Sequence, residues 1–279
     1  FFSWPRKMLP EIYLDFPLNE IPPIIHQTWK NETIPEKWVE SYENYDKLDG
    51  FQHVLWTDKM NRELIETHFP EYLKLYDSYK YPIQRADMVR YFILYKYGGI
   101  YSDLDISPIP QKFEDMYETF KNGDVVLAEC NEKTSFANQN LTNAFMMSRK
   151  GSDFWKIVWQ LLKTPFKENS WKYILSDVKY FHVLFTTGPG IISDASRKYE
   201  NTEIISYKLI QPSEGGKEAA VKILEGSSWH SSDDSKIRKA GDSIKDSAGV
   251  MLIIGVTILG ILVMLGFIIY SKIVKMKRN

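Results

Sequence analysis

Two aspartates separated by one residue follow a pair of glycines in "GGIYSDLDISP", residues 98 to 108. Residues i and i+2 of an extended segment project to the same side, so we expect Asp103 and Asp105 to face one point while Leu104 turns into the core. Paired carboxylates suit Mg²⁺ or Mn²⁺, and a buried carboxylate needs such a partner. The spacing predicts a divalent-cation site with room for the diphosphate of a nucleotide sugar, and a solvated turn is the alternative.

A second set of charges lies on the segment before the glycines. Residues 85 to 97, "RADMVRYFILYKY", predict a helix that is apolar on nearly every side and ends at Gly98. Asp87 and Arg90 lie within about 60° of each other around that helix. They either pair with each other, or Asp87 binds hydroxyl groups of a sugar or ribose while Arg90 reaches a phosphate or sugar. In the second case the glycine pair turns the chain so that both charged pairs face one cleft.

The surrounding elements alternate between strand and helix, which favours an α/β fold with a mixed sheet flanked by helices. Short apolar runs predict strands at 24–28, 51–57, 100–103, 125–130 and 143–148. Apolar periodicity predicts helices at 35–45, 57–69, 85–97 and 152–163, with a further short helix after the "TGPG" break at 187–190.

Four motifs in this order resemble a known family. They are "IPPIIHQTWK", "YPIQRADMVRYFILYKYGGIYSDLD", "TGPG" and "GSSWH", spread over residues 21 to 234. Together they resemble the Asp-x-Asp glycosyltransferases, the group that contains fungal initiating α-1,6-mannosyltransferases and the mannosyltransferase subunits of mannosyl-inositolphosphoceramide synthase. The similarity is greatest to the sphingolipid enzymes. It implies a GT-A-like fold, a nucleotide-sugar donor, Mn²⁺ or Mg²⁺ as cofactor, and transfer with retention of anomeric configuration.

The resemblance also implies roles for individual residues. The expected catalytic residues are Asp103, Asp105, Asp87 and Arg90, and the expected metal ligands are Asp103, Asp105 and His230. The expected donor-binding residues are His26, Gln27, Thr28, Asp87, Arg90, Asp103, Asn143, Gly188, Ser228 and Trp229. Several have structural alternatives: His26 as a satisfied core histidine, Asn143 as a strand-end residue, Gly188 as a turn residue, Trp229 as a packing residue and His230 as a surface residue.

Composition excludes some classes of protein. The chain has 35 basic and 36 acidic residues, and its net charge of −1 argues against a general nucleic-acid binder. Its single cysteine, Cys130, excludes an internal disulfide and a zinc site built on several thiolates.

A membrane anchor is expected near the C-terminus. Residues 249 to 270 contain no charged residue and are long enough to span a bilayer, while the basic segment 271 to 279 is expected in the cytosol. We therefore expect an N-terminal arm at 1–20, a GT-A-like domain at 21–230, a polar stalk at 231–248, a transmembrane helix and a cytosolic tail. This order predicts a Golgi or endoplasmic reticulum membrane protein with a lumenal catalytic domain, consistent with sequons at Asn31 and Asn140.

The hypothesis drawn from these observations is transfer of mannose from GDP-mannose to the membrane lipid inositolphosphoceramide, with a possible regulatory membrane subunit. One alternative keeps the fold with another nucleotide sugar or a glycoprotein acceptor. A second is a catalytically silent partner subunit of a membrane enzyme. The Asp-x-Asp spacing also matches haloacid-dehalogenase-like phosphatases, but their first aspartate follows an opening strand, and here it lies far into the chain.

Overall fold

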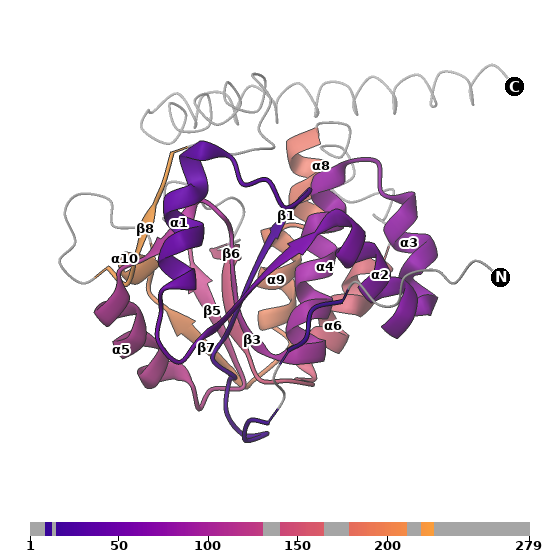
Figure 1. Ribbon diagram of the computed structural model, residues 1–279. Coiled ribbons are helices and arrows are strands. Elements are labelled where there is room, and N and C mark those ends of the chain that lie inside the picture. Colours follow the sequence, from indigo (N-terminus) through magenta and orange to yellow (C-terminus); the bar gives the residue numbers. More distant parts are fainter. Residues whose placement is uncertain (1–8, 13–14, 131–139, 165–178, 211–218, 226–279) are drawn as a thin grey trace, which may run out of the picture. The chain divides into compact units, whose positions relative to one another are not determined.

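The computed structural model describes residues 9–12, 15–130, 140–164, 179–210 and 219–225 (Figure 1). The chain divides into two units, Phe1–Trp229 and His230–Asn279, and the second lies wholly outside the described residues. The predicted stalk and membrane helix therefore also lie outside them. Within the described ranges, no helix combines the length and apolar character needed to cross a membrane.

A mixed six-stranded sheet forms the centre of the first unit, in the order β2-β1-β3-β6-β5-β7 (Figure 1). Its strands are β1 (Ile24–Trp29), β2 (Gln52–Thr57), β3 (Gly99–Ser102), β5 (Val125–Glu129), β6 (Leu141–Ser148) and β7 (Thr202–Ile205). β1 runs parallel to β2 and β3, and β5 runs parallel to β7, whereas β6 is antiparallel to both β3 and β5. The predicted mixed α/β sheet is confirmed.

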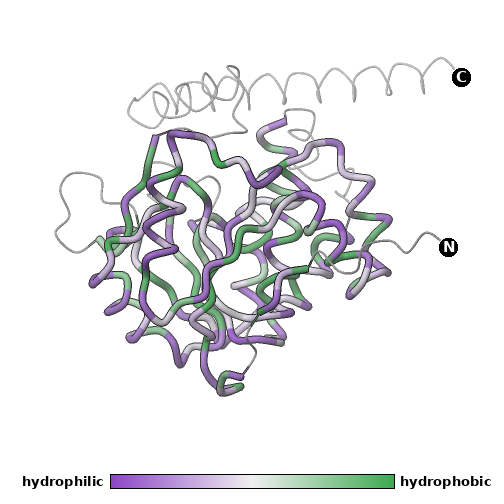
Figure 2. Tube along the Cα trace, in the orientation of Figure 1, coloured by the Kyte–Doolittle hydropathy of each residue, from purple (hydrophilic) through white to green (hydrophobic). Residues whose placement is uncertain are grey.

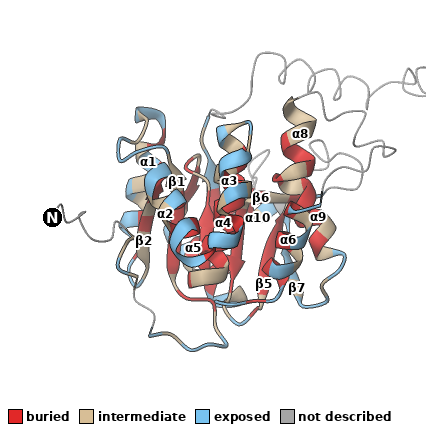
Figure 3. Cartoon of the chain, turned by 90° about the vertical axis from the view of Figure 1, so that its right-hand side faces the viewer, coloured by how far each residue is buried: buried red, intermediate tan, exposed pale blue. Residues whose placement is uncertain are grey.

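Helices cover both faces of this sheet. On one face lie α2 (Asp58–His68), η1 (Pro70–Tyr72), α3 (Leu73–Ser78), α4 (Pro82–Tyr97), α6 (Phe154–Leu162) and α9 (Pro189–Ser196), with α8 (Lys179–Thr186) packed against α4 and α9. On the other face lie α1 (Glu36–Asp46), α5 (Pro110–Phe120) and α10 (Tyr207–Ile210). The outer sides of α1, α3 and α5 are exposed (Figure 3).

Alternating strand residues divide the core between the two faces. Ile24 and Tyr101 pack with α2 and α4, whereas their neighbours Ile25 and Ile100 pack with α1 and α5. Both faces of the sheet are covered, so strands such as β5 bury consecutive apolar residues (Figure 2), and the polar residues His26 and Gln27 of β1 are buried as well. This burial fixes the register in which the ends of β1, β2 and β3 meet.

Helix α4 is the most deeply buried of these helices, and the glycine pair follows it directly. It begins at Pro82, three residues before the predicted start, because proline is well suited to the first helical turn. It ends where predicted, at Gly98, whose φ is +71°. Gly99 has φ +99°, and a Cβ there would lie 2.4 Å from the carbonyl oxygen of Ile24. Gly99 is thus required by the close packing of β3 against β1, and a Cβ at Gly98 would lie 2.7 Å from the backbone nitrogen of Lys150.

The two aspartates of the motif lie in a tight turn, not on the extended segment that the sequence predicted. The N–H of Ile106 donates to the carbonyl of Asp103 at 3.0 Å, which closes a turn over residues 103 to 106. The chain then forms β4 (Ile106–Pro108), which pairs antiparallel with β8 (Val221–Ile223) in a second, small sheet. Because the chain has to leave the central sheet to make this pairing, β3 stops at Ser102.

Candidate functional site

A cavity of about 450 Å³ lies where β1, β2 and β3 end. Its lining includes three acids, three bases and three aromatic residues, namely Asp58, Asp103, Asp105, Lys30, Arg90, Lys179, Trp29, Trp38 and Tyr81. Lys30 and Asp58 follow the last residues of β1 and β2, just as Asp103 follows β3. The carboxyl ends of neighbouring parallel strands are the usual position of ligand sites in α/β sheets.

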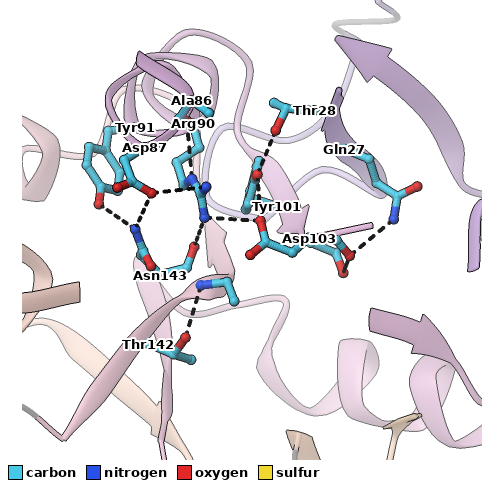
Figure 4. Close-up of polar contacts among 12 residues, drawn as sticks. Gln27, Thr28, Ala86, Asp87, Arg90, Tyr91, Tyr101, Asp103, Thr142 and Asn143 are labelled. Atoms are coloured by element: carbon cyan, nitrogen blue, oxygen red, sulfur yellow. Dashed lines mark hydrogen bonds and ion pairs between the residues drawn. The ribbon is translucent and has the colours of Figure 1, made fainter. Parts of the chain in front are cut away.

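Arg90 stands at the centre of the polar contacts beside this cavity (Figure 4). Its Nη2 forms an ion pair with Asp87 at 3.1 Å, and its Nη1 forms an ion pair with Asp103 at 3.1 Å. Nη1 also donates to the carbonyl of Asn143 at 2.7 Å, and Nε donates to that of Ala86 at 3.3 Å. The pairing of Asp87 with Arg90 within the helix is confirmed, and Arg90 also pairs with the aspartate motif; contact of Asp87 or Arg90 with a substrate stays a prediction.

Asp87 is buried behind Arg90 and is held by neutral donors as well. Its Oδ1 accepts from Asn143 Nδ2 at 2.9 Å, and its Oδ2 accepts from Thr187 Oγ1 at 3.1 Å. Asn143 Nδ2 also donates to the hydroxyl of Tyr91 at 3.0 Å. Burial raises the pKa of Asp87 to about 6, although Arg90 opposes that shift. The carboxylate stays ionised at neutral pH and keeps Arg90 in place.

Burial disfavours the charged form of Arg90, but Asp103, Tyr101 and Asp87 outweigh that effect and raise its pKa. The guanidinium carbon also lies 4.4 Å from the centre of the Tyr101 ring. All three guanidinium nitrogens face oxygens of the protein. Arg90 is thus committed mainly to holding the two carboxylates.

One oxygen of Asp103 is already occupied by protein groups. The Tyr101 hydroxyl donates to Asp103 Oδ1 at 2.8 Å, and the same oxygen is the one that pairs with Arg90. Thr28, which lines the cavity, lies 2.9 Å from the Tyr101 hydroxyl through its own Oγ1. The orientation of the Asp103 carboxylate is therefore fixed by groups from β1, β3 and α4, which leaves Oδ2 for a ligand.

The carboxylate of Asp105 differs from that of Asp103 in its ion-pair partners. Among the described residues, no lysine, arginine or histidine forms an ion pair with its carboxylate. Burial and the negative charge of Asp103 raise the pKa of Asp105 to about 7. A half-buried acid beside a second acid is stabilised by a cation, so the pair fits a hard divalent ion. In the described part of the chain, no third Asp, Glu, His or Cys joins them in a metal-binding group, and His230 lies outside that part.

The first-strand residues of the predicted site differ in position. Thr28 lines the cavity, but His26 is fully buried in the core. The ring of His26 donates from Nε2 to the carbonyl of Gly98 at 2.9 Å, and its Nδ1 accepts from the indole of Trp56 at 3.1 Å. Burial lowers its pKa to about 4. This is the satisfied core histidine that the sequence left as an alternative.

The remaining predicted site residues also differ in where they lie. Gln27 is fully buried and bonds to the backbone of Asp103, and Asn143 joins the Asp87 network. Gly188 precedes α9, where a Cβ would lie 3.0 Å from the carbonyl oxygen of Val183, so the tight packing there favours glycine. Ser228, Trp229 and His230 lie outside the described residues.

Sequence reasoning missed several residues of the site. Tyr101 lies two positions before Asp103, and Asp58 follows the end of β2, so strand periodicity and strand ends were available signals. Trp38 lies on α1, a helix that the apolar periodicity predicted, although the pattern did not mark Trp38 as a site residue. Lys179 begins α8, far away in the sequence, and no local pattern marks it.

Residues 33–122 match a glycosyltransferase sugar-binding region containing a DXD motif. That stretch includes Asp87, Arg90, Asp103 and Asp105. The chain is also 38% identical over 221 residues to inositol phosphoceramide mannosyltransferase 3 of Schizosaccharomyces pombe, which covers 76% of this chain and 57% of that protein. The chain belongs to the glycosyltransferases that contain a DXD motif. The family expected from the four sequence motifs is confirmed.

Several other proteins are similar to this DXD glycosyltransferase. Identity is 34% over 228 residues to mannosyl phosphorylinositol ceramide synthase CSH1 of Saccharomyces cerevisiae, covering 79% of this chain and 56% of that protein. It is 24% over 229 residues to the initiation-specific alpha-1,6-mannosyltransferase of Candida albicans, covering 72% and 60%. The solved PaToxG glycosyltransferase superposes weakly, with a TM-score of 0.44 at 16% identity over 64% of this chain and 70% of that one. The chain spans a little more than half the length of the first curated relatives it matches.

Proposed function

We propose that this chain is the catalytic part of a metal-dependent, retaining glycosyltransferase that transfers mannose from GDP-mannose to inositolphosphoceramide. The observation that carries the proposal is that Asp103, Asp105 and Arg90, all within the matched family region, line one cavity where three parallel strands end. The names of the two sphingolipid relatives support the choice of sugar and acceptor.

In this proposal Asp105 is the principal protein ligand of Mn²⁺ or Mg²⁺, with Asp103 beside it. The bound cation would neutralise the charge that develops on the nucleoside diphosphate as the glycosidic bond breaks. Lys30 and Lys179 line the same cavity and add positive charge for the diphosphate. Arg90 contributes chiefly by holding Asp103, and its direct contact with a phosphate stays a prediction.

His230 remains a candidate third metal ligand. The N–H of Leu224 donates to the carbonyl of Asp105 at 2.7 Å, and the indole of Trp38 donates to the carbonyl of Glu225 at 3.3 Å. The described chain thus ends beside the aspartate turn. Ser228, Trp229 and His230 follow the described residues, and their roles toward the donor and the metal stay predictions.

The donor sugar and ribose are assigned to the free oxygen of Asp103, with Thr28 on the adjacent wall of the cavity. His26, Gln27, Asn143 and Asp87 support these groups from behind in this scheme, because none of them lines the cavity. Gly188 supports them through the packing of α9. The membrane location, the Golgi or endoplasmic reticulum site and a regulatory membrane subunit are parts of the same proposal.

The test is an assay of the full chain with GDP-mannose, Mn²⁺ and vesicles that contain inositolphosphoceramide. We expect a mannosylated lipid, loss of product in a chelator, and loss of at least about 100-fold in activity for Asp103→Asn and Asp105→Asn. Asp77→Asn, an exposed carboxylate paired with Arg62, is the matched control and keeps full activity. Transfer from UDP-sugars alone refutes the donor, transfer only to soluble glycans refutes the acceptor, and normal product from the aspartate variants refutes catalysis at this site.

A further inference from the structure

The backbone carbonyls of the aspartate turn are held by side chains from outside it. The carbonyl of Asp103 accepts from Gln27 Nε2 at 3.4 Å, and the carbonyl of Ile106 accepts from Ser41 Oγ at 2.6 Å. Asp103 and Ile106 are the two ends of the turn, joined to each other by a hydrogen bond of 3.0 Å. Gln27 comes from β1 and Ser41 from α1, so two elements grip the turn at its opposite ends.

These two side chains belong to one directional chain of hydrogen bonds. His53 Nε2 donates to Gln27 Oε1 at 3.0 Å, and Gln27 Nε2 donates to Ser41 Oγ at 3.4 Å. The Ser41 hydroxyl then donates onward to Ile106. Gln27 and Ser41 are fully buried, and among the described residues their side-chain donors bond to one another and to the turn. Buried polar groups of this kind are costly to leave unpaired, so each fixes the next.

We infer that Gln27 is a positioning residue for the metal site. It does not line the cavity, so it does not touch the donor. By holding the Asp103 carbonyl, it fixes the backbone from which both carboxylates project. This role replaces the direct donor contact expected from the sequence. The inference rests on the proposed function for its catalytic meaning, but the restraint on the turn is testable without a ligand.

Gln27→Met tests the restraint because methionine is similar in size and makes no comparable hydrogen bonds. The matched control is Asn44→Ala: Asn44 Nδ2 also joins α1 to β4, but it donates at 3.0 Å to the side chain of Ser107, outside the turn. In the ligand-free full chain, we expect Gln27→Met to speed hydrogen exchange of the Ile106 amide about tenfold. Asn44→Ala is expected to leave that amide within about twofold of the wild type.

Ser41→Ala provides a second, smaller change at the other end of the turn. It should speed exchange at the same amide, and combining it with Gln27→Met should add less than the product of the two single effects, because both act through one chain of bonds. Unchanged exchange at Ile106 in both single variants overturns the positioning role. If Gln27→Met does not fold, hydrogen exchange of the Ile106 amide in Ser41→Ala alone tests the restraint on the turn.

A second measurement tests whether the turn affects the metal site. Mn²⁺ binding is measured by electron paramagnetic resonance, with and without GDP. We expect Gln27→Met to raise the Kd for Mn²⁺ about tenfold while Asn44→Ala leaves it unchanged. Equal affinity in Gln27→Met and wild type overturns the inference. If the wild type itself binds no Mn²⁺ with GDP, the proposed function fails, and the exchange measurement still decides the role of Gln27.

Discussion

Arg90 joins two carboxylates that stand on different elements: its Nη2 lies 3.1 Å from Asp87 on the same helix, and its Nη1 lies 3.1 Å from Asp103 beyond the end of β3. Arg62 makes a comparable double contact on the surface, with Glu66 at 3.1 Å and Asp77 at 2.9 Å. The Arg90 side chain is 3% exposed, whereas that of Arg62 is 44% exposed. The chain thus contains two similar arginine bridges in opposite environments.

Arg90→Lys should therefore be far more damaging than Arg62→Lys. A lysine ammonium cannot span both carboxylates, so a buried acid loses its partner, at a cost of about 3–5 kcal/mol. The exposed bridge is worth about 1 kcal/mol or less. Urea unfolding of the two variants, with transfer assays alongside, makes the comparison. Equal stability losses would show that the Arg90 bridge does not support the fold.

Asp105→Asn should stabilise the metal-free protein while abolishing metal binding. The neutral amide removes a carboxylate whose pKa is raised by burial and by the charge of Asp103. We expect the Tm at pH 7.5 to rise by a few degrees and the added stabilisation by Mn²⁺ with GDP to disappear. Thermal unfolding with and without Mn²⁺ and GDP measures both effects. A Tm that still rises on adding Mn²⁺ would exclude Asp105 as a ligand.

Gly99→Ala should destabilise the fold much more than Gly50→Ala. Both glycines have positive φ, +99° and +77°, but a Cβ at Gly99 would lie 2.4 Å from a backbone oxygen, whereas nothing lies within 4 Å at Gly50. The Gly50 variant carries only the conformational cost of about 1 kcal/mol. The Gly99 variant must also displace β1 from β3, so we expect a loss of several times that amount. Similar urea midpoints for the two variants would contradict the close packing.

Two buried histidines should weaken the fold in mild acid, whereas Asp87 and Asp105, whose pKa values burial raises to about 6 and about 7, should act in the opposite direction. Burial lowers the pKa of both His26 and His53 from 6.5 to about 4. At these two sites the unfolded chain therefore binds more protons between these values, and the stability that the neutral histidines contribute above pH 6.5 is lost as the pH falls toward 4. Between pH 7.5 and 5.0 each histidine should cost on the order of 2 kcal/mol.

Urea unfolding at several pH values tests this expectation. His26→Gln keeps a donor for the carbonyl of Gly98, so it should lower stability at pH 7.5 yet remove the loss of about 2 kcal/mol that His26 contributes between pH 7.5 and 5.0, measured as the difference from the wild type. An unchanged pH dependence in that variant would show that other groups cause the acid loss.

Local patterns predicted five of the six strands of the central sheet and several of its helices, but they missed α3, α5 and β7, and not all contacts of the site followed from them. Apolar runs located β1, β2 and β5, and the glycine pair located the end of α4, because these signals depend on neighbouring residues. The turn after α4 predicted that the two charged pairs face one cleft, and Arg90, Asp103 and Asp105 do line the same cavity. What failed were arrangements set by distant partners.

The aspartate turn and the first strand illustrate this limit. The turn forms where β4 leaves the central sheet to pair with β8. Residues 98 to 108 alone do not indicate that β8 is the pairing partner. Gln27 and Thr28 are neighbours in one polar motif, yet only Thr28 lines the cavity. Alternation along the strand separates them, and the sequence did not reveal which face the cavity occupies.

The pairing of β4 with β8 has a consequence for biosynthesis. During translation Asp105 leaves the ribosome well before Leu224, whose N–H is the last of the described groups to engage the turn. Until β8 is made, the backbone between the two aspartates lacks that support, however completely β1 and α4 have assembled. A nascent chain therefore has its acidic pair long before β8 can support it, so the cation affinity proposed for this pair should develop only once β8, the last of the described strands, is synthesised.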